Sequence, residues 1–582
     1  MDKTALIIVS VCVALLGYGF YTKSKTQPTR PQTAAPRAAD TQPLVPARPA
    51  DEQLRAAPDP VAPERNLAPE QLVTLENDYF RVITTTHGGG IKRVELKKHR
   101  LGIDAPVVLN NGAPLPVFNI SGWSADANLI GYSVAASDTA SVTFTRELQP
   151  GLIINRKFTV SGDYQLTLDQ IITNRTGDIK VLPPYRLALG AVTALHPENA
   201  GAESRYVTLS WYSTGGKYAK SDITSFDGFA PLGFKFTSGK TVIGSDGENP
   251  VRWASVKSQF FAMIIDCQGF DALRAEGTRQ HLPDLATRPG AAVPTGIVGD
   301  LAISGITINP DTSASQQFSL YAGPKENSRL QALPDHQAEI MEFGAFIGPI
   351  SSLLLWLMNT IHGFAANYGL AIIIVTVIIR AVLWWPQSAA NRSMKRMQAV
   401  APLMKETQEK FKDKPEKLNQ EMMKIYKEYG VNPVGSCLPM LIQFPIFLGF
   451  YWMLQSSIEL RHEHFLWIKD LSQPDTVWRL ALGGFSLPVN PMPLVMTLTM
   501  YLSMRISPQP QGVDNPMMKM MKFMPLFFLL FCYNFSSALS LYWTAQNILS
   551  IVQMRYNLKQ VAPTLEAMKA QAAARRKQQR KR

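Results

Sequence analysis

A long apolar segment close to the N-terminus restricts what this chain can fold into more than any other feature. Residues 4–22 carry no charge, and the run ALIIVSVCVALLGYGFY is continuously apolar, which approaches the ~20 residues that a helix needs to cross a bilayer. The alternative is a cleaved signal peptide. However, Lys3 is the only basic residue before the run, and small residues suited to cleavage, such as Ala34 and Ala35, lie too far downstream. We therefore expect an uncleaved membrane anchor over residues 1–25.

Five further apolar segments lie in the second half of the chain. They cover residues 369–385, 434–454, 491–506, 523–535 and 538–554. Several are shorter than a relaxed bilayer requires, so we expect flanking residues to extend them or the membrane to thin locally. The pattern predicts a polytopic α-helical membrane protein with six spans.

The charges of the connecting segments predict the topology. Residues 391–430 carry ten basic and six acidic side chains, and the tail from residue 561 carries seven basic and one acidic. Residues 456–490 carry three basic side chains against four acidic ones. Because basic loops are retained in the cytoplasm, we expect both termini inside, residues 456–490 outside, and the segment between the first two spans exported.

The exported segment changes character near residue 70. Residues 27–70 hold ten prolines, and such a composition buries too little apolar surface to fold, which predicts a disordered linker over residues 26–70. Residues 71–325 alternate between apolar and polar in short runs, for example Phe158 and Val160 before a turn at Ser161-Gly162-Asp163. This alternation predicts one large all-β sandwich.

The rest of the chain is divided by its helical patterns. Apolar residues around Met341 to Ala366 predict a helix that lies in the outer membrane interface. A later segment has apolar side chains spaced three and four apart, interrupted at Lys414-Pro415, which predicts two antiparallel amphipathic helices. The expected boundaries are 326–368 for the linker and interfacial helix, 369–386 for the second span, 387–431 for the cytoplasmic helical hairpin, 432–556 for spans three to six, and 557–582 for a basic cytoplasmic tail.

The sequence shows no motif of catalysis or metal binding. The four cysteines have no metal-ligand spacing, and no GxxxxGK nucleotide site occurs. An intramembrane hydrolase is disfavoured because Gly435-Ser436-Cys437 lacks the GxSxG context and His462-Glu463-His464 lacks HExxH spacing. We expect no enzyme, cofactor, metal or small-molecule substrate. The net charge of +13 indicates an acidic partner such as lipid headgroups or RNA.

Arg380 is the residue of the second span that most requires an explanation. An unpaired guanidinium at mid-span costs between ~3 and ~15 kcal/mol. Snorkelling is one explanation, because Arg380 lies five residues before Trp385 at the cytoplasmic edge. Polar residues in several other spans favour instead a wet cavity that is open to the cytoplasm. The residues predicted to line this hydrophilic groove are Arg380, Thr376, Gln443, Gln546 and Asn547.

Aromatic and proline residues form an apolar counterpart to this groove. Phe444 and Pro445 lie in the third span, and Tyr542 and Trp543 lie at the start of the sixth. Most such residues face lipid or pack inside a bundle, but together these four could line a sliding surface for another apolar helix.

Several of these segments resemble the YidC/Oxa/Alb membrane protein insertases. The resemblance rests on Arg380 late in the second span, the basic helical hairpin, NPVGSCLPMLIQFPIFLGFYWML at 432–454 and SSALSLYWTAQNILSIVQ at 536–553. The Gly88-Gly89-Gly90 turn and the run Leu320-Tyr321-Ala322-Gly323-Pro324 are similar to the Gram-negative YidC branch. The resemblance implies a β-supersandwich periplasmic domain, a five-helix insertase core behind the N-terminal anchor, and a place in the bacterial inner membrane.

The resemblance also implies roles for the residues named above. Arg380 would supply the positive charge of a groove open to cytoplasm and lipid, and Phe444, Pro445, Tyr542 and Trp543 match positions that contact the nascent helix. The family commonly has a second Tyr where this chain has Trp543, so a hydroxyl is lost there. The leading expectation is a non-enzymatic insertase that takes nascent membrane proteins from the ribosome or the Sec translocon. The alternative is a transporter or channel with Arg380 as an anion site, which the lack of an internal repeat disfavours.

The basic tail predicts a further contact. Its charge exceeds what the positive-inside rule needs, and two acidic partners are available, anionic lipids and ribosomal RNA. We expect the tail and the hairpin to dock the translating ribosome together. The expected ribosome contacts in the tail are Arg575, Arg576, Lys577, Arg580, Lys581 and Arg582.

Overall fold

The structure is a computed structural model that describes most of the chain after residue 68. The described ranges are 69–101, 105–123, 131–195, 203–227, 239–282, 295–344, 346–412, 414–431, 438–482, 485–506, 523–558 and 564–570. The expected membrane anchor at 1–25 and nearly all of the linker at 26–70 lie outside these residues. The described part divides after Met341 into two compact units, which we call the β unit and the helical unit and describe separately.

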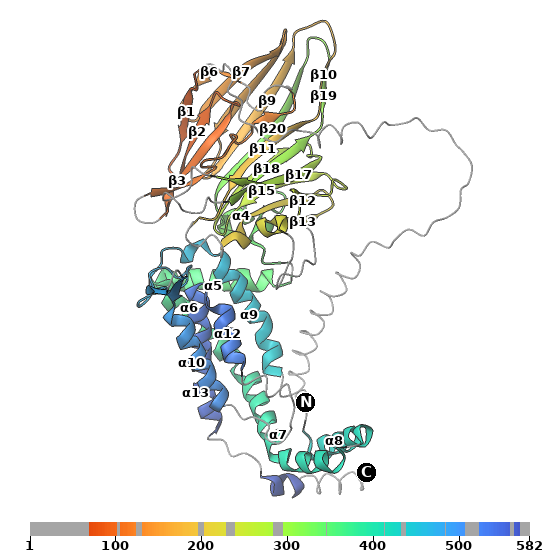
Figure 1. Cartoon of the computed structure of the whole chain (residues 1–582), viewed down its shortest axis with the longest axis vertical. Helices are drawn as coiled ribbons and strands as arrows, with labels where there is room; N and C mark the ends of the chain where they lie inside the picture. Colours follow the sequence, from red (N-terminus) through yellow and green to blue (C-terminus); the bar gives the residue numbers. More distant parts are fainter. Residues whose placement is uncertain are drawn as a thin grey trace, which may run out of the picture. The chain divides into compact units, whose positions relative to one another are not determined.

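The β unit is built around a nine-stranded antiparallel sheet, and Figure 1 shows its long strands. The hairpin that the alternation predicted is present in it, because Phe158 lies opposite Leu168, and Val160 lies opposite Leu166, across the Ser161-Gly162-Asp163 turn. In spatial order the strands are β13 (Lys217–Asp222), β12 (Thr208–Ser213), β15 (Val251–Lys257), β16 (Phe261–Gln268), β20 (Ser313–Pro324), β9 (Gln165–Asn174), β8 (Leu152–Val160), β7 (Ser141–Gln149) and β6 (Ser133–Ser137).

Smaller sheets complete the β unit. One has the order β14 (Val242–Gly244), β17 (Arg274–His281), β18 (Thr295–Ile303), β11 (Tyr185–Val192) and β5 (Ile120–Ser121). Another runs from β1 (Leu72–Glu76) through β2 (Phe80–Thr85) and β3 (Gly90–Leu101) to β4 (Ala105–Leu109), and β10 (Lys180–Leu182) pairs with β19 (Ile306–Ile308).

Part of the core of the β unit lies where the five-stranded sheet packs against strands β12 and β15. Gly299 on β18 illustrates how close this packing is, since an added Cβ would lie 2.7 Å from Val256 Cγ1 and 3.1 Å from Leu189 Cδ1. Val256, Leu189 and Leu209 are all buried. Two sheets that bury apolar faces against each other confirm the predicted all-β sandwich architecture.

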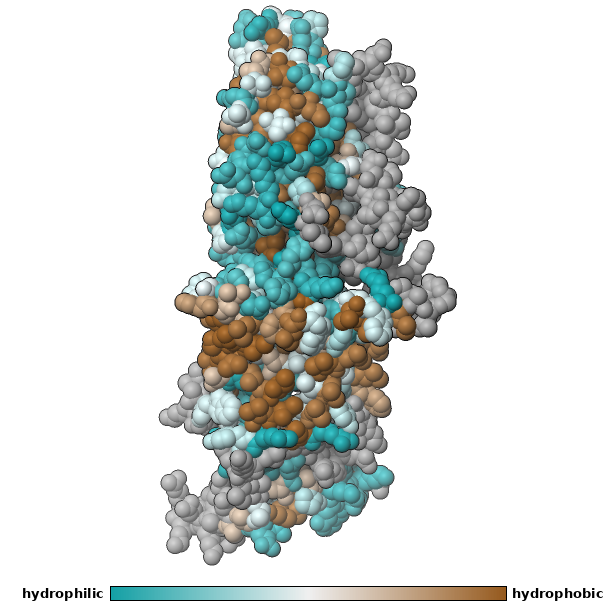
Figure 2. Space-filling view, turned by 90° about the vertical axis from the view of Figure 1, so that its left-hand side faces the viewer, coloured by the Kyte–Doolittle hydropathy of each residue, from teal (hydrophilic) through white to brown (hydrophobic). Residues whose placement is uncertain are grey.

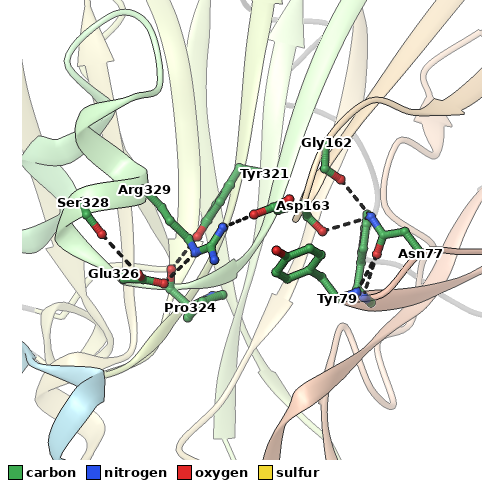
Figure 3. A network of polar contacts seen from close by, with 10 residues as sticks. Asn77, Tyr79, Gly162, Asp163, Tyr321, Pro324, Glu326, Ser328 and Arg329 are labelled. Atoms are coloured by element: carbon green, nitrogen blue, oxygen red, sulfur yellow. Dashed lines mark hydrogen bonds and ion pairs between the residues drawn. The ribbon is translucent and has the colours of Figure 1, made fainter. Parts of the chain in front are cut away.

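A network of polar contacts fixes the point where the chain leaves the large sheet (Figure 3). The Asn77 side-chain amide donates to the carbonyls of Gly162 and Asp163, at 2.8 and 3.1 Å. Arg329, on helix α4 (Asn327–Gln331), pairs with the Asp163 carboxylate through Nη1 and donates to Glu326 from Nε at 2.6 Å. The guanidinium therefore ties the segment after β20 to the β8–β9 turn.

The helical unit begins with helix α5 and ends, in the described part, at residue 570. Helix α5 is held against helix α9, because Ser351 Oγ donates to the Gly449 carbonyl at 3.1 Å. The helices are α5 (Gly348–Ala365), α6 (Tyr368–Val382), α7 (Trp384–Lys410), α8 (Pro415–Tyr429), α9 (Leu438–Ser456), α10 (Pro491–Ile506), α12 (Met524–Cys532) and α13 (Ser537–Leu558), and the hairpin strands are β21 (Trp478–Leu482) and β22 (Phe485–Val489).

The helices of the described residues test the expected spans only in part. None of them by itself is both long and apolar enough to cross a bilayer, while α6 and α7 meet that test together across a bend of 58°. The second span was expected over residues 369–386, whereas α6 ends at Val382 and Pro386 lies in the first turn of α7, where a proline is tolerated. The predicted count of six spans is therefore not confirmed by the described helices.

Helices α7 and α8 form the helical hairpin that the apolar spacing predicted. Residues 411–414 separate the two helices. The buried residues Met397, Val400 and Met404 of α7 cluster with Val431, and Ile425 of α8 packs against them. Met568, from the part of the tail that precedes its basic residues 575–582, belongs to the same cluster.

Hydrophobic side chains cover much of the helical unit, as Figure 2 shows for one face. On α10, Leu494, Leu498 and Leu502 recur every fourth residue and are exposed. On α12, Leu526 and Leu530 repeat the same spacing and are also exposed. Apolar stripes of this size on a helix surface are typical of a helix that contacts lipid or another protein.

Candidate functional site

Arg380 lies on the last turn of α6 with its side chain almost fully buried. Its Nη2 donates to Ser550 Oγ on α13 at 2.7 Å. The Ser550 hydroxyl in turn donates to the carbonyl of Gln546 at 2.8 Å. Among the described residues no carboxylate pairs with Arg380, and its Nε has no hydrogen-bond partner. A buried guanidinium held by one neutral hydroxyl retains donors for an anionic group.

Gln443 on α9 connects three helices through its side-chain amide. Its Oε1 accepts from Gln546 Nε2 at 2.9 Å and from Gln387 Nε2 at 3.5 Å. Its Nε2 donates to the Tyr542 hydroxyl at 3.1 Å. Gln387 belongs to α7, and Gln546 and Tyr542 belong to α13, so the polar cluster lies where α7, α9 and α13 meet.

One face of α13 carries most of this cluster. Tyr542, Gln546, Ser550 and Gln553 are spaced four, four and three residues apart, which places them on one side of a helix. Gln553 Nε2 donates to Ser388 Oγ on α7 at 3.2 Å and to the Trp384 carbonyl at 3.1 Å. The sequence analysis did not select Gln387, Ser550 or Gln553, although the helical spacing from Tyr542 could have identified the latter two.

The structure separates Asn547 from the other predicted groove residues. Its amide donates to the Met496 carbonyl at 3.4 Å and to Thr499 Oγ1 at 3.3 Å, so it lies against α10. Neighbouring positions on a helix are 100° apart, which explains why Gln546 and Asn547 face different partners. The structure thus does not bring the Asn547 amide together with those of Gln443 and Gln546, and its place in the groove remains a prediction.

Thr376 lies one turn before Arg380 on α6 and is buried. Its hydroxyl donates to the carbonyl of Ile372 in the same helix at 2.7 Å. This bond uses its only proton within the helix, so Thr376 offers an acceptor but no free donor to the polar cluster.

The four residues expected to form a sliding surface differ in exposure. Phe444 is 50% exposed, while Pro445 and Trp543 are partly buried. Tyr542 is only 2% exposed, and its ring stacks on Phe450 with ring centroids 4.0 Å apart. The structure therefore presents Phe444 at the surface and covers Tyr542, and the sliding surface expected of these four residues remains a prediction.

Trp543 packs between two phenylalanines. Its ring lies 4.7 Å from the ring of Phe447 on α9 and 4.7 Å from the ring of Phe528 on α12. Trp543 thus joins α13 to both neighbouring helices. The expected ribosome contacts at 575–582 lie outside the described residues, and that expectation remains a prediction.

Comparisons with known proteins cover both units. A family model described as 60Kd inner membrane protein matches residues 360–566, and one described as the YidC periplasmic domain matches residues 72–357. A membrane protein insertase YidC from Pelodictyon phaeoclathratiforme is 31% identical over 543 residues, which cover 88% of this chain and 87% of the relative. The insertase YidC of Nitratidesulfovibrio vulgaris is 29% identical over 580 residues, which cover 96% and 99% of the two chains.

Solved structures give weaker similarities. A crystal structure of an active YidC insertase with its first transmembrane domain resolved is 14% identical, covers 84% of this chain and 92% of that one, and has a TM-score of 0.32. A putative aldose 1-epimerase from Escherichia coli covers 44% of this chain and 99% of its own, at 12% identity and a TM-score of 0.27.

The matched family models and the similar insertases define this chain as a non-enzymatic membrane protein insertase. More specifically, the chain belongs to the YidC family, and its β unit is the periplasmic domain of that family.

Proposed function

We propose that Arg380, Gln443 and Gln546 line a hydrophilic groove through which this insertase passes the polar flank of a nascent membrane helix. One observation carries the proposal. The buried guanidinium of Arg380 contacts the Ser550 hydroxyl at 2.7 Å and, among the described residues, has no carboxylate partner. An acidic side chain in the substrate would supply the missing countercharge.

The energetics favour this use of Arg380. A buried charge without a partner is costly in an apolar medium. The amides of Gln443, Gln546 and Gln387 reduce the cost of bringing water and a polar segment into the same region. A carboxylate of the substrate that pairs with Arg380 would offset part of the free energy lost by burying the guanidinium. The groove would therefore bind the acidic segment, which is unfavourable in the lipid hydrocarbon.

The apolar part of the substrate would take a different path. The exposed ring of Phe444 and the neighbouring Pro445 provide the contact surface. Tyr542 and Trp543 contact the same helix, α9, through the rings of Phe450 and Phe447. A nascent helix can then pass over Phe444 into lipid while its polar flank follows the groove.

The charge distribution supports the topology. The protein would lie in the bacterial inner membrane with six spans, both termini in the cytoplasm, and the β unit as a supersandwich in the periplasm. The basic hairpin of α7 and α8 would then be cytoplasmic, and residues 456–490 would face the periplasm, in agreement with the positive-inside rule.

The partners follow from this arrangement. Nascent membrane proteins would arrive from the translating ribosome, docked by the hairpin and the basic tail, or from the Sec translocon. Anionic lipids compete for the same basic residues, since each Lys or Arg near an anionic surface contributes ~1 kcal/mol.

Reconstitution tests the function against its alternative. Liposomes that contain only this protein should insert a single-span substrate that protein-free liposomes leave outside, and they should not accelerate the flux of small anions. Rapid anion flux without substrate insertion would instead favour a transporter or channel with Arg380 as its anion site.

A further inference from the structure

The β21–β22 hairpin between α9 and α10 has one apolar face. Its register pairs Trp478 with Val489 and Leu480 with Leu487. Because neighbouring strand positions alternate between the two faces and paired positions share a face, each face can be assigned. The apolar face holds positions Trp478, Leu480, Leu482, Phe485, Leu487 and Val489, and the opposite face holds Arg479, Ala481, Ser486 and Pro488.

Two side chains of this face, both on β21, are exposed. Trp478 is 61% exposed and Leu480 is 42% exposed. A two-stranded hairpin is at best marginally stable alone in water. The hairpin therefore requires a surface against which its apolar face can pack.

The base of the hairpin is held firmly by polar contacts. Thr476 Oγ1 donates to Asn490 Oδ1 at 2.7 Å, and Asn490 Nδ2 donates to the carbonyl of Tyr533 at 2.8 Å. The Tyr533 hydroxyl donates to the Pro488 carbonyl at 2.6 Å. These bonds join both strands to the segment that follows α12, so the hairpin has a fixed direction relative to the helices.

A second aromatic side chain is fixed next to the hairpin. The carboxylate of Asp475 accepts from Trp467 Nε1 at 3.0 Å and from the backbone N–H of Met492 at 2.7 Å. The Trp467 ring stays 45% exposed, and its neighbour Leu466 is 73% exposed. The Trp467 ring is thus held through its indole N–H while it remains accessible, and the Trp478 ring is exposed beside it in sequence.

The chain itself indicates what covers the hairpin. Strand β22 ends two residues before α10 begins, and α10 carries the exposed stripe of Leu494, Leu498 and Leu502. Such a stripe is typical of a helix that contacts lipid or another protein, and in a membrane insertase we take lipid as its partner. Only Asn490 separates the hairpin from this helix along the chain.

The depth of the hairpin follows from its open edges. A two-stranded ribbon leaves backbone N–H and C=O groups unpaired, which the hydrocarbon core does not tolerate. Tryptophan is enriched at the membrane–water interface. Both constraints are met at the boundary between headgroups and acyl chains, with Arg479 on the opposite face directed to water.

We propose that the apolar face of β21–β22 lies on the periplasmic surface of the phospholipid bilayer and holds the start of α10 at a fixed depth. The side of the membrane rests on the topology proposed above. Contact with the bilayer is independent of how the groove around Arg380 works.

Spin labels at two adjacent positions test the proposal. Leu480→Cys places a nitroxide on the apolar face and Arg479→Cys places one on the opposite face, each in the full-length chain after replacement of the natural cysteines. In liposomes of phosphatidylethanolamine and phosphatidylglycerol, the label at 480 should collide several-fold more with oxygen than with a water-soluble nickel chelate, and the label at 479 should show the reverse.

A label at 480 that is shielded from both reagents would mean that protein covers the face. Equal nickel accessibility at 479 and 480 would mean that the face lies in water, and either result overturns the proposal.

Tryptophan fluorescence of the unlabelled chain provides a second measurement, in which no spin label can alter the packing of the hairpin. Brominated acyl chains quench tryptophans that touch the bilayer, so Trp478→Phe should reduce the quenchable fluorescence, whereas Trp253→Phe, which removes a buried ring of the β unit, should not. An unchanged quenchable fraction in Trp478→Phe would contradict the proposal. Substrate insertion is not the readout, so a failure here is distinguishable from a failure of the proposed function.

Discussion

The Arg380 guanidinium on α6 and the Ser550 hydroxyl on α13 lie 2.7 Å apart, and this bond joins two helices that are far apart in sequence. Ser550 shares a helix face with Gln546, which extends the contact to Gln443 on α9. The positive charge is therefore placed at the end of a continuous row of neutral polar groups. In the proposed groove this row would guide the polar segment of a substrate. Among the described residues no carboxylate pairs with Arg380, so its charge is available to that segment.

Replacing Arg380 should affect substrates according to their charge. Arg380→Ala should reduce insertion of a short-tailed substrate with an acidic translocated segment by about ten-fold or more, because one charge-assisted hydrogen bond to a carboxylate contributes ~1.5–3 kcal/mol. Arg380→Lys should retain most of the activity. The measurement is protease protection of the inserted segment, with a neutral variant of the same substrate as the control. Equal insertion of the acidic substrate by the Ala variant would remove Arg380 from the mechanism.

Sequence patterns predicted the local elements well. The alternation around Phe158 predicted the β8–β9 hairpin, and the apolar spacing in the basic loop predicted α7 and α8. Both patterns are local, since each reflects a single buried face. The large sheet could not be ordered in this way, because β20 lies between β9 and β16 through contacts far apart in the chain.

The composition of the site was predicted only in part, for a physical reason. Arg380, Gln443 and Gln546 were expected together and lie in one polar cluster. Asn547 was expected with them but contacts α10, because the packing of α10 decides which side of α13 each neighbouring residue faces. Ser550 was missed because a serine that bonds to its own helix is common and gives no signal until Arg380 is seen beside it.

The stability of the β unit should depend on pH through Asp266. Burial raises the pKa of this carboxyl to about 6, and the nearby Asp335 acts in the same direction, while Arg252 partly opposes both. The folded state then binds more protons than the unfolded state between the ordinary pKa of 3.8 and about 6. The free energy of unfolding must therefore fall as the pH rises through this window, by about 1–3 kcal/mol.

Urea unfolding of the detergent-solubilised chain, followed by the β-sheet circular dichroism signal, measures this dependence. The wild type should lose stability as the pH rises from about 3.8 to about 6. Asp266→Asn should lose less over the same range, whereas Asp311→Asn, at an exposed turn, should follow the wild type. An identical pH profile for Asp266→Asn would show that Asp266 does not titrate in this window.

The packing of α5 on α9 depends on a glycine. A Cβ at Gly449 would lie 2.8 Å from Ile350 Cγ2, and Ser351 bonds to the Gly449 carbonyl. Gly449→Val should therefore push α5 away and cost about 1–3 kcal/mol, lowering the thermal unfolding temperature in detergent. Gly363→Ala is the matched control, because no atom lies within 4 Å of its added Cβ. If both variants unfold at the wild-type temperature, α5 is not held as described.

The basic tail is expected to contribute to ribosome docking. Removal of residues 575–582 eliminates six basic side chains and should weaken co-sedimentation of the solubilised protein with ribosomes at low salt, because contacts to RNA phosphates depend strongly on salt. The control exchanges the same six residues between Lys and Arg, which keeps the charge. Unchanged co-sedimentation after truncation would leave lipid binding or topology as the role of the tail.

Site-specific crosslinking to a stalled nascent chain tests the central claim most directly. A photoreactive residue at Phe444, which is exposed next to the polar cluster, is compared with one at Leu498, which is exposed on α10. The groove account predicts that the nascent helix crosslinks strongly to position 444 during insertion and at most weakly to position 498. Equal crosslinking at both positions, or none at 444 while insertion proceeds, would contradict it.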